Sequence, residues 1–175
     1  MIDPWDFFIN KQDLGLQPWG EPVPMEIYGP PVTPDVIQRA EQELGVKLPD
    51  AYLELIKGCN GGYLKEERSF ITPPVPLAYH GDQIEVRQIP GIGYEAGIDA
   101  PFGSKYLCAE WEYPPEDCVW LEGDGHWCLL MDYRQCGPEG EPSILFADSE
   151  AEPMEFVTIA YNFRAFLNQL SPAQH

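Results

Sequence analysis

The chain has 175 residues, enough for one domain with a single core, and 44% of them are hydrophobic, so it is expected to fold on its own. It carries 29 Asp and Glu against 10 Lys and Arg, a formal charge of −19 at pH 7. Such a surface repels phosphate backbones and anionic membranes, so direct binding to nucleic acid or membrane is not expected, and a macromolecular partner should be basic. Acidity that serves only solubility explains the same composition equally well.

The cysteines and the beginning of the chain bear on the cellular compartment. Cys59, Cys108, Cys118, Cys128 and Cys136 form an odd set without a CxxC pair. The opening residues, MIDPWDFFINKQDLG, have acids where an export signal has basic residues, and they lack an apolar run long enough to span a membrane. The sequence therefore predicts a cytoplasmic protein with reduced, mostly buried thiols.

Residues 1–32 combine large aromatic side chains with prolines. Proline prevents long helices, whereas the aromatic side chains supply apolar anchors. The composition predicts an irregular arm that packs on a single domain formed by residues 33–170, with residues 171–175 as a tail. The side chains in question are Trp5, Phe7, Phe8, Trp19 and Tyr28 among Pro4, Pro18, Pro22, Pro24, Pro30 and Pro31.

A helical hairpin is predicted directly after this arm. Thr33 is a good N-cap, Pro34 fits the first helical position, and Gly45 supplies the left-handed residue that ends the helix. Pro49 begins a second helix, which 58-GCNGG-62 terminates. Neither helix is long enough to be stable alone, so their apolar faces must dock, most economically on a sheet.

The rest of the chain supplies that sheet and a closing helix. Residues 91–113 are ambiguous, with a glycine-rich front followed by a helical turn over Lys105 to Glu112. Asn162 caps the last helix, which has one apolar face. The predicted fold class is α+β, with the N-terminal helix pair and the C-terminal helix packed on a mainly antiparallel sheet. The predicted strands are Tyr63 to Leu64, Ser69 to Ile71, Ile84 to Ile89, Cys118 to Leu121, Trp127 to Asp132 and Ser143 to Phe146.

The segment 121-LEGDGHWCLLMDYR-134 crowds acids, a histidine and a cysteine, and so raises the question of metal or catalytic chemistry. The spacing matches neither a zinc site nor a calcium loop, and the chain has no HExxH, no GxSxG and no P-loop. Burial in a strand would raise the pKa of Cys128 and make the thiol unreactive. No metal, no cofactor and no catalytic residue is therefore predicted. Residues Glu122 to Gly125 are interpreted as a turn before a strand that is apolar on both faces.

Two groups of motifs carry a family resemblance. The first is a helix from Thr33, then 46-VKLPDAY-52, a second helix and 60-NGG-62. The second consists of 123-GDGHWCLLMDYR-134, 137-GPEGEPSILFADSE-150 and 159-IAYNFRAFL-167. In this order, over about residues 33–170, they resemble the SUKH superfamily, which includes the Smi/Knr yeast cell-wall regulators. The chain departs from the family pattern in residues 1–32 and 91–106.

The resemblance implies an α+β domain that acts by binding and not by catalysis. Many bacterial members are cytoplasmic immunity proteins that neutralise a polymorphic or contact-delivered toxin, and eukaryotic members are regulatory interaction hubs. The leading hypothesis is an immunity protein whose partner is a basic toxin domain. The alternative is a regulatory protein-protein interaction module without a toxin partner, and an enzyme that uses unrecognised carboxylates ranks third.

Exposed acids and aromatic side chains on the hairpins are expected to contact the partner. For Trp111, a place in the core is the competing interpretation, because aromatic side chains are often largely buried. The predicted partner-binding residues are Glu110, Trp111, Glu112, Glu116, Asp117, Glu122 and Asp124.

Overall fold

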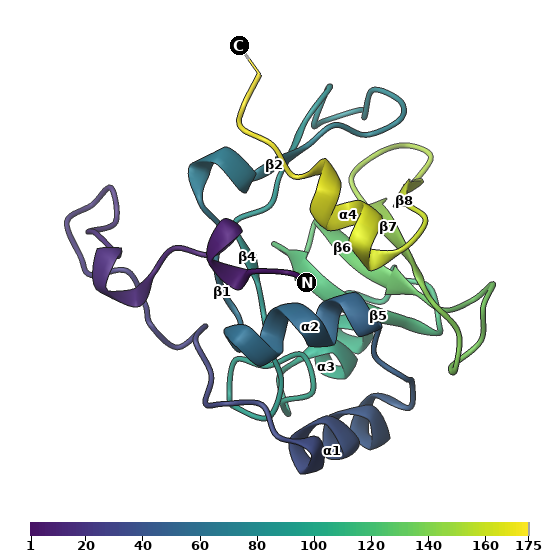
Figure 1. The fold of residues 1–175 in the computed structure, drawn as a ribbon. Helices are drawn as coiled ribbons and strands as arrows, with labels where there is room; N and C mark the ends of the chain where they lie inside the picture. The colour runs from purple at the N-terminus through teal and green to yellow at the C-terminus, as the bar shows by residue number, and fades with distance from the viewer. Residues whose placement is uncertain (175) are drawn as a thin grey trace.

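The computed structural model describes residues 1–174, which contain four α-helices, eight strands and three short 3-10 helices (Figure 1). The 3-10 helices are Pro4–Asp6, Lys11–Asp13 and Glu66–Arg68. In chain order the other elements are α1 (Pro34–Leu44), α2 (Asp50–Gly58), β1 (Gly62–Tyr63), β2 (Phe70–Ile71), β3 (Ile84–Glu85), β4 (Gln88–Ile89), α3 (Ser104–Trp111), β5 (Cys118–Gly123), β6 (Trp127–Asp132), β7 (Ser143–Asp148), β8 (Glu155–Ala160) and α4 (Phe163–Gln169).

The main sheet is an antiparallel meander of β5, β6, β7 and β8 in that order, so β6 and β7 are its central strands. The short strands before it form two separate antiparallel pairs, β1 with β4 and β2 with β3. The predicted α+β class with a mainly antiparallel sheet is confirmed. The sequence prediction missed β8, and it placed the early strands in the same sheet as the later ones.

Both faces of the main sheet are covered, which explains why β6 is apolar on both sides. On one face, Leu129 and Met131 join the larger core with side chains of α2 and α4. On the other face, Cys128 and Leu130 form a smaller cluster against Leu107 and Cys108 of α3. Helices therefore cover both faces of this strand.

The helix ends follow the capping residues in the sequence. The Thr33 hydroxyl accepts a hydrogen bond from the Val36 N–H at 3.3 Å, and Gly45 ends α1 in the left-handed conformation at φ 74°. The Asn162 side chain accepts from the Ala165 N–H at 2.7 Å and begins α4. These predicted helices and the helical turn of α3 are confirmed. Helix α1 contributes only one buried residue and lies at the edge of the molecule, away from the sheet (Figure 1).

Several family-motif residues hold loops in place. The Asn60 amide, 5% exposed, donates to the carbonyls of Pro30 and Ile92 at 2.7 and 2.9 Å and accepts from the Ile92 N–H at 2.9 Å. The hydroxyl of Tyr52 donates to the Pro90 carbonyl at 2.8 Å. These bonds satisfy backbone groups that have no strand partner, so the motif serves the architecture.

The first 32 residues are attached to the body at two places. At the first, Phe8 is fully buried and pairs with Leu64, and the Ile9 N–H donates to the Tyr63 carbonyl at 2.9 Å. At the second, Ile27 and Tyr28 are buried. Between them, residues 10–26 project from the body as a loop beside β1 and β4 (Figure 1). We call residues 10–26 the arm loop.

The five cysteines are free thiols in different environments. Cys128 is buried, Cys59, Cys108 and Cys118 are half-buried, and Cys136 is exposed, so the prediction of mostly buried thiols holds for Cys128 alone. Among residues 1–174, none of the helices has the length and apolar character needed to cross a membrane.

Candidate partner-binding surface

The turns of two hairpins lie at the same end of the main sheet. The β5–β6 turn is at Asp124 to His126, and the β7–β8 loop is at Ser149 to Met154. They are neighbours because Trp127, which follows the first turn, pairs with Asp148, which precedes the second loop. The end of α3 reaches the same place, with its last residue, Trp111, beside His126. We call the surface formed by residues 110–112, 124–126 and 148–156 the hairpin end.

Trp111 is fixed over the β5–β6 turn and remains accessible. Its ring centroid lies 5.6 Å from that of His126, and the residue is 39% exposed. Gly125 beneath it has φ 98°, and a Cβ there would come within 2.0 Å of the indole. Only glycine combines that backbone conformation with such a close approach. Trp111 is thus neither a core residue nor a freely mobile one, and it offers a preorganised apolar surface.

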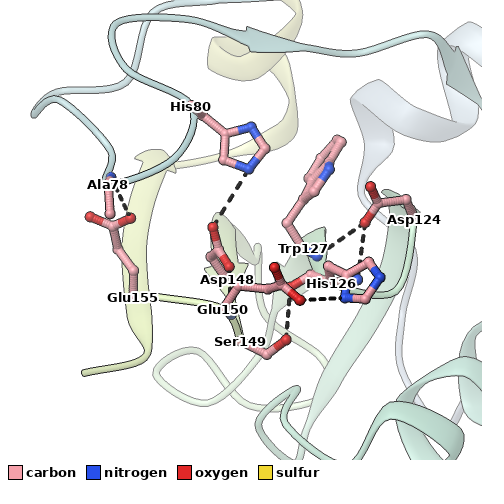
Figure 2. A network of polar contacts seen from close by, with 9 residues as sticks. All are labelled: Ala78, His80, Asp124, His126, Trp127, Asp148, Ser149, Glu150 and Glu155. Atoms are coloured by element: carbon pink, nitrogen blue, oxygen red, sulfur yellow. Dashed lines mark hydrogen bonds and ion pairs between the residues drawn. The ribbon is translucent and has the colours of Figure 1, made fainter. Parts of the chain in front are cut away.

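Two hydrogen-bonded acids shape the exposed rim of the hairpin end (Figure 2). The Asp124 carboxylate accepts from the backbone N–H groups of His126 and Trp127 at 3.0 and 3.2 Å, which closes the turn. The exposed Glu150 carboxylate lies 2.8 Å from Nδ1 of His126 and connects the two hairpins. Both carboxylates therefore present their remaining acceptor positions to solvent from fixed places.

A second set of polar contacts lies next to this rim and joins it to the loop that carries Ala78 and His80 (Figure 2). Asp148 is buried, and one of its oxygens lies 3.5 Å from Nε2 of His80. His80 packs edge-on against Trp127 and Phe146, with ring centroids 5.3 and 5.2 Å apart. The Ala78 N–H donates to Glu155 at 3.1 Å. The loop between β2 and β3 is thereby held against the hairpin end.

The electrostatic character of the hairpin end is uniformly acidic. Its three segments contain no Lys or Arg. The same segments also contain exposed apolar side chains, with Met154 at 52%, Phe156 at 44% and Trp111 at 39% exposure. A surface of this kind suits a protein partner with a basic patch. The acids are Glu110, Glu112, Asp124, Asp148, Glu150, Glu152 and Glu155.

The structure brings together only some of the residues that the sequence singled out. Glu110, Trp111, Glu112 and Asp124 meet at the hairpin end. Glu116 and Asp117 are exposed but lie at the opposite end of the sheet, because the next residue, Cys118, pairs with Asp132 at the end of β6.

The sequence predicts Glu122 to be an exposed acid of the turn, and that prediction is wrong. It lies within β5 and is 5% exposed. Its carboxylate accepts from the N–H groups of Gln88 at 2.9 Å and Gly123 at 3.2 Å. Burial raises the pKa of Glu122 to about 7, against the opposing effect of the Gln88 and Gly123 N–H groups and of Arg87.

The burial of Glu122 comes from a bulge in β5. Trp120 pairs with Leu130, yet Glu122 pairs with Leu129, so Leu121 is an extra residue. Regular alternation would place Glu122 on the same face as Trp120. The bulge instead turns it toward β4, where its carboxylate takes the place of a backbone partner for Gln88.

Sequence reasoning missed the contribution of β8 and its loop. Glu150, Glu152 and Phe156 were not among the predicted residues, although they form much of the hairpin end. The available signal was 155-EFVTIA-160, a run rich in β-branched and aromatic residues that predicts a strand. Once β8 is recognised, the loop before it must lie beside the β5–β6 turn.

Two observations bear on the metal and cysteine chemistry that the sequence raised. Among residues 1–174, no three His, Cys, Asp or Glu side chains are placed to hold a metal ion. Burial raises the pKa of the Cys128 thiol to about 12, so that thiol is protonated at neutral pH, in agreement with the expectation that it is unreactive.

Comparison with known proteins gives one result. A sequence model described as the SMI1 / KNR4 family (SUKH-1) matches residues 31–169. The comparisons with curated proteins and with solved structures return no match. The match includes the whole hairpin end and leaves out the arm loop.

Proposed function

Because the chain belongs to the SMI1/KNR4 family (SUKH-1), we propose that it is a cytoplasmic immunity protein that neutralises a basic toxin domain by binding it through the hairpin end. The observation that carries the proposal is the acidic hairpin end, free of Lys and Arg, with Trp111 held over the β5–β6 turn. The family resemblance supplies the toxin as the class of partner.

The proposed mechanism is competition for a basic surface. A toxin that cleaves or modifies nucleic acid needs Lys and Arg to bind the phosphate backbone. An inhibitor with fixed carboxylates occupies the same cations and excludes the substrate. Asp124 and Glu150 are suited to this role because hydrogen bonds already hold them, which reduces the entropy lost on binding.

Long-range attraction should add to the association rate. With a formal charge of −19, the whole chain attracts a basic partner, and the hairpin end concentrates that charge at one end of the sheet. Trp111, Met154 and Phe156 then provide apolar contact area in the complex.

The test is a rescue assay combined with binding kinetics. The chain is co-expressed with each toxin domain encoded in the genome of its source, and rescue of growth identifies the partner. Failure to rescue growth against every such toxin would overturn the immunity proposal. Capture of a signalling protein from the source cells in place of a toxin would favour the alternative, a regulatory interaction module.

The surface is tested with charge variants of equal net charge. Glu150→Lys with Glu152→Lys changes the hairpin end, and Glu116→Lys with Glu139→Lys makes the same charge change at exposed positions elsewhere. The first pair is expected to slow association with the toxin on the order of ten-fold at low salt, and the second pair much less. Equal effects of the two pairs would show that only net charge matters, and would remove the hairpin end from the proposal.

A further inference from the structure

A groove lies between the arm loop and the body of the protein, away from the hairpin contacts described above. Its volume is about 780 Å³, within the range of sites that bind small molecules or short peptide segments. Leu16 and Val23 of the arm loop form one wall. Phe70 of β2, Gln88 of β4 and Glu122 of β5 form the other.

The arm loop forms this wall without hydrogen bonds to the body. Its own bonds are internal, such as the Gln17 N–H to the Glu21 carbonyl at 2.7 Å and the Gly20 N–H to the Gln17 carbonyl at 2.8 Å. No hydrogen bond joins residues 11–25 to residues 29–174. A ligand can therefore enter between loop and body without breaking a hydrogen bond.

The charge of the groove favours a cation. Four acids line it, and Arg87 is the basic residue in the lining. The acids are Asp13, Glu66, Glu85 and Glu122. Glu122 is 5% exposed and forms no ion pair with any other residue in the range 1–174. A buried carboxylate that forms no ion pair gains most from a bidentate guanidinium, which supplies both charge and directed donors.

We propose that this groove binds an extended peptide segment of a partner protein, with an arginine side chain paired to Glu122 and apolar neighbours against Leu16, Val23 and Phe70. The acidic lining selects the cation, and the apolar walls accept the flanking side chains. The proposal does not depend on whether the partner is a toxin, since the hairpin end is a separate surface. The arm loop lies outside the family match, whereas Phe70, Gln88 and Glu122 of the other wall lie within it.

The experiment is a titration of the full chain with an acetylated and amidated tripeptide of leucine, arginine and leucine, followed by NMR chemical shifts and calorimetry. Backbone signals of Gln88 and Gly123, which donate to the Glu122 carboxylate, should shift, with a Kd of about a millimolar or tighter. The matched tripeptide with citrulline replaces the guanidinium by a neutral group of the same shape, and it should bind about ten-fold more weakly or not at all.

Three variants separate binding from a structural role. Glu122→Gln should lose the preference for arginine over citrulline. Leu16→Lys, which places a competing cation on the arm wall, should weaken arginine binding, whereas Val75→Lys at another exposed apolar position should not.

The affinity of the unmodified chain for the arginine peptide should rise between pH 6 and pH 8, as Glu122 ionises beside Glu85 and Arg87, and this rise should be absent in Glu122→Gln. Equal binding of both peptides, or no shifts at about ten times the expected Kd, would overturn the proposal.

Discussion

Ionisation of Glu122 should make the protein less stable as the pH rises through neutrality. The carboxyl has an ordinary pKa of 4.5, and burial raises it to about 7 in the folded protein. Between these values the folded state holds a proton that the unfolded state has released, so the free energy of unfolding falls as the pH rises. The difference between the two pKa values corresponds to about 3 kcal/mol once the pH is above both.

The substitution Glu122→Gln removes the charge at every pH and leaves one oxygen for the two backbone N–H groups that donate to the carboxylate, so the pH dependence of the difference in stability reports the ionisation. Near pH 5 the variant should be about as stable as the unmodified chain. At pH 8.5 it should be more stable, by up to about 3 kcal/mol, since it avoids a buried charge. Urea unfolding at a series of pH values, followed by tryptophan fluorescence, gives the difference in free energy directly.

Glu116→Gln is the matched control, because Glu116 is exposed and loses the same charge. Its effect should stay within about 0.5 kcal/mol at every pH. A difference between Glu122→Gln and the unmodified chain that is constant from pH 5 to pH 8.5 would refute the reasoning. So would a variant that is less stable at pH 8.5, since that would mean the charged carboxylate is favourable in its site.

Three further substitutions test the framework by urea unfolding. Asn60→Ala should lower the free energy of unfolding by about 3 kcal/mol, because it leaves buried backbone groups without hydrogen-bond partners. The control Asn168→Ala, at an exposed position of α4, should lower it by less than about 0.5 kcal/mol. Equal losses in the two variants would contradict the role of Asn60. Gly125→Ala should lower the free energy of unfolding by about 2 kcal/mol and displace Trp111, which would change the tryptophan emission. An unchanged spectrum and stability would count against the close contact between Gly125 and Trp111. Leu130→Ala should lower the free energy of unfolding by about 3 kcal/mol, because Leu130 is buried between the main sheet and α3. A loss below about 1 kcal/mol would mean that this face of the sheet is open to solvent.

The helices could be predicted from the sequence because their signals are local. Thr33 and Asn162 act as caps through residues three positions away, and Gly45 needs only its own backbone conformation. The same applies to the order of the motifs that carries the family resemblance. Such features depend on neighbouring residues and not on how the chain folds back on itself.

The site was harder to predict because its residues converge through tertiary contacts. Trp111 and His126 are brought together by the packing of α3 on the sheet, which no local pattern records. Glu122 appeared to be a turn residue because it precedes Gly123, yet one extra residue in β5 moves it into the strand and toward β4. A bulge changes which face a side chain occupies, so acids beside a hairpin cannot be assigned to solvent by alternation alone.

The family motif and the two proposed binding surfaces occupy different parts of the molecule. Asn60 and Tyr52 hydrogen-bond to backbone carbonyls and fix loops, so their side chains are not available to a partner. Membership of the family therefore accounts for the framework, whereas we propose that the choice of partner depends on the hairpin end and the arm loop.

The end of β5 connects these two surfaces. Glu122 and Gly123 line the groove, and Asp124 immediately after them begins the turn of the hairpin end. Residues two apart along a strand are about 7 Å apart, a separation that one partner segment easily spans. A basic partner held by its charge at the hairpin end would therefore place any adjoining extended segment close to the groove. Because the second contact would then be intramolecular, even a groove that binds a free tripeptide weakly would add substantially to the affinity of the whole complex.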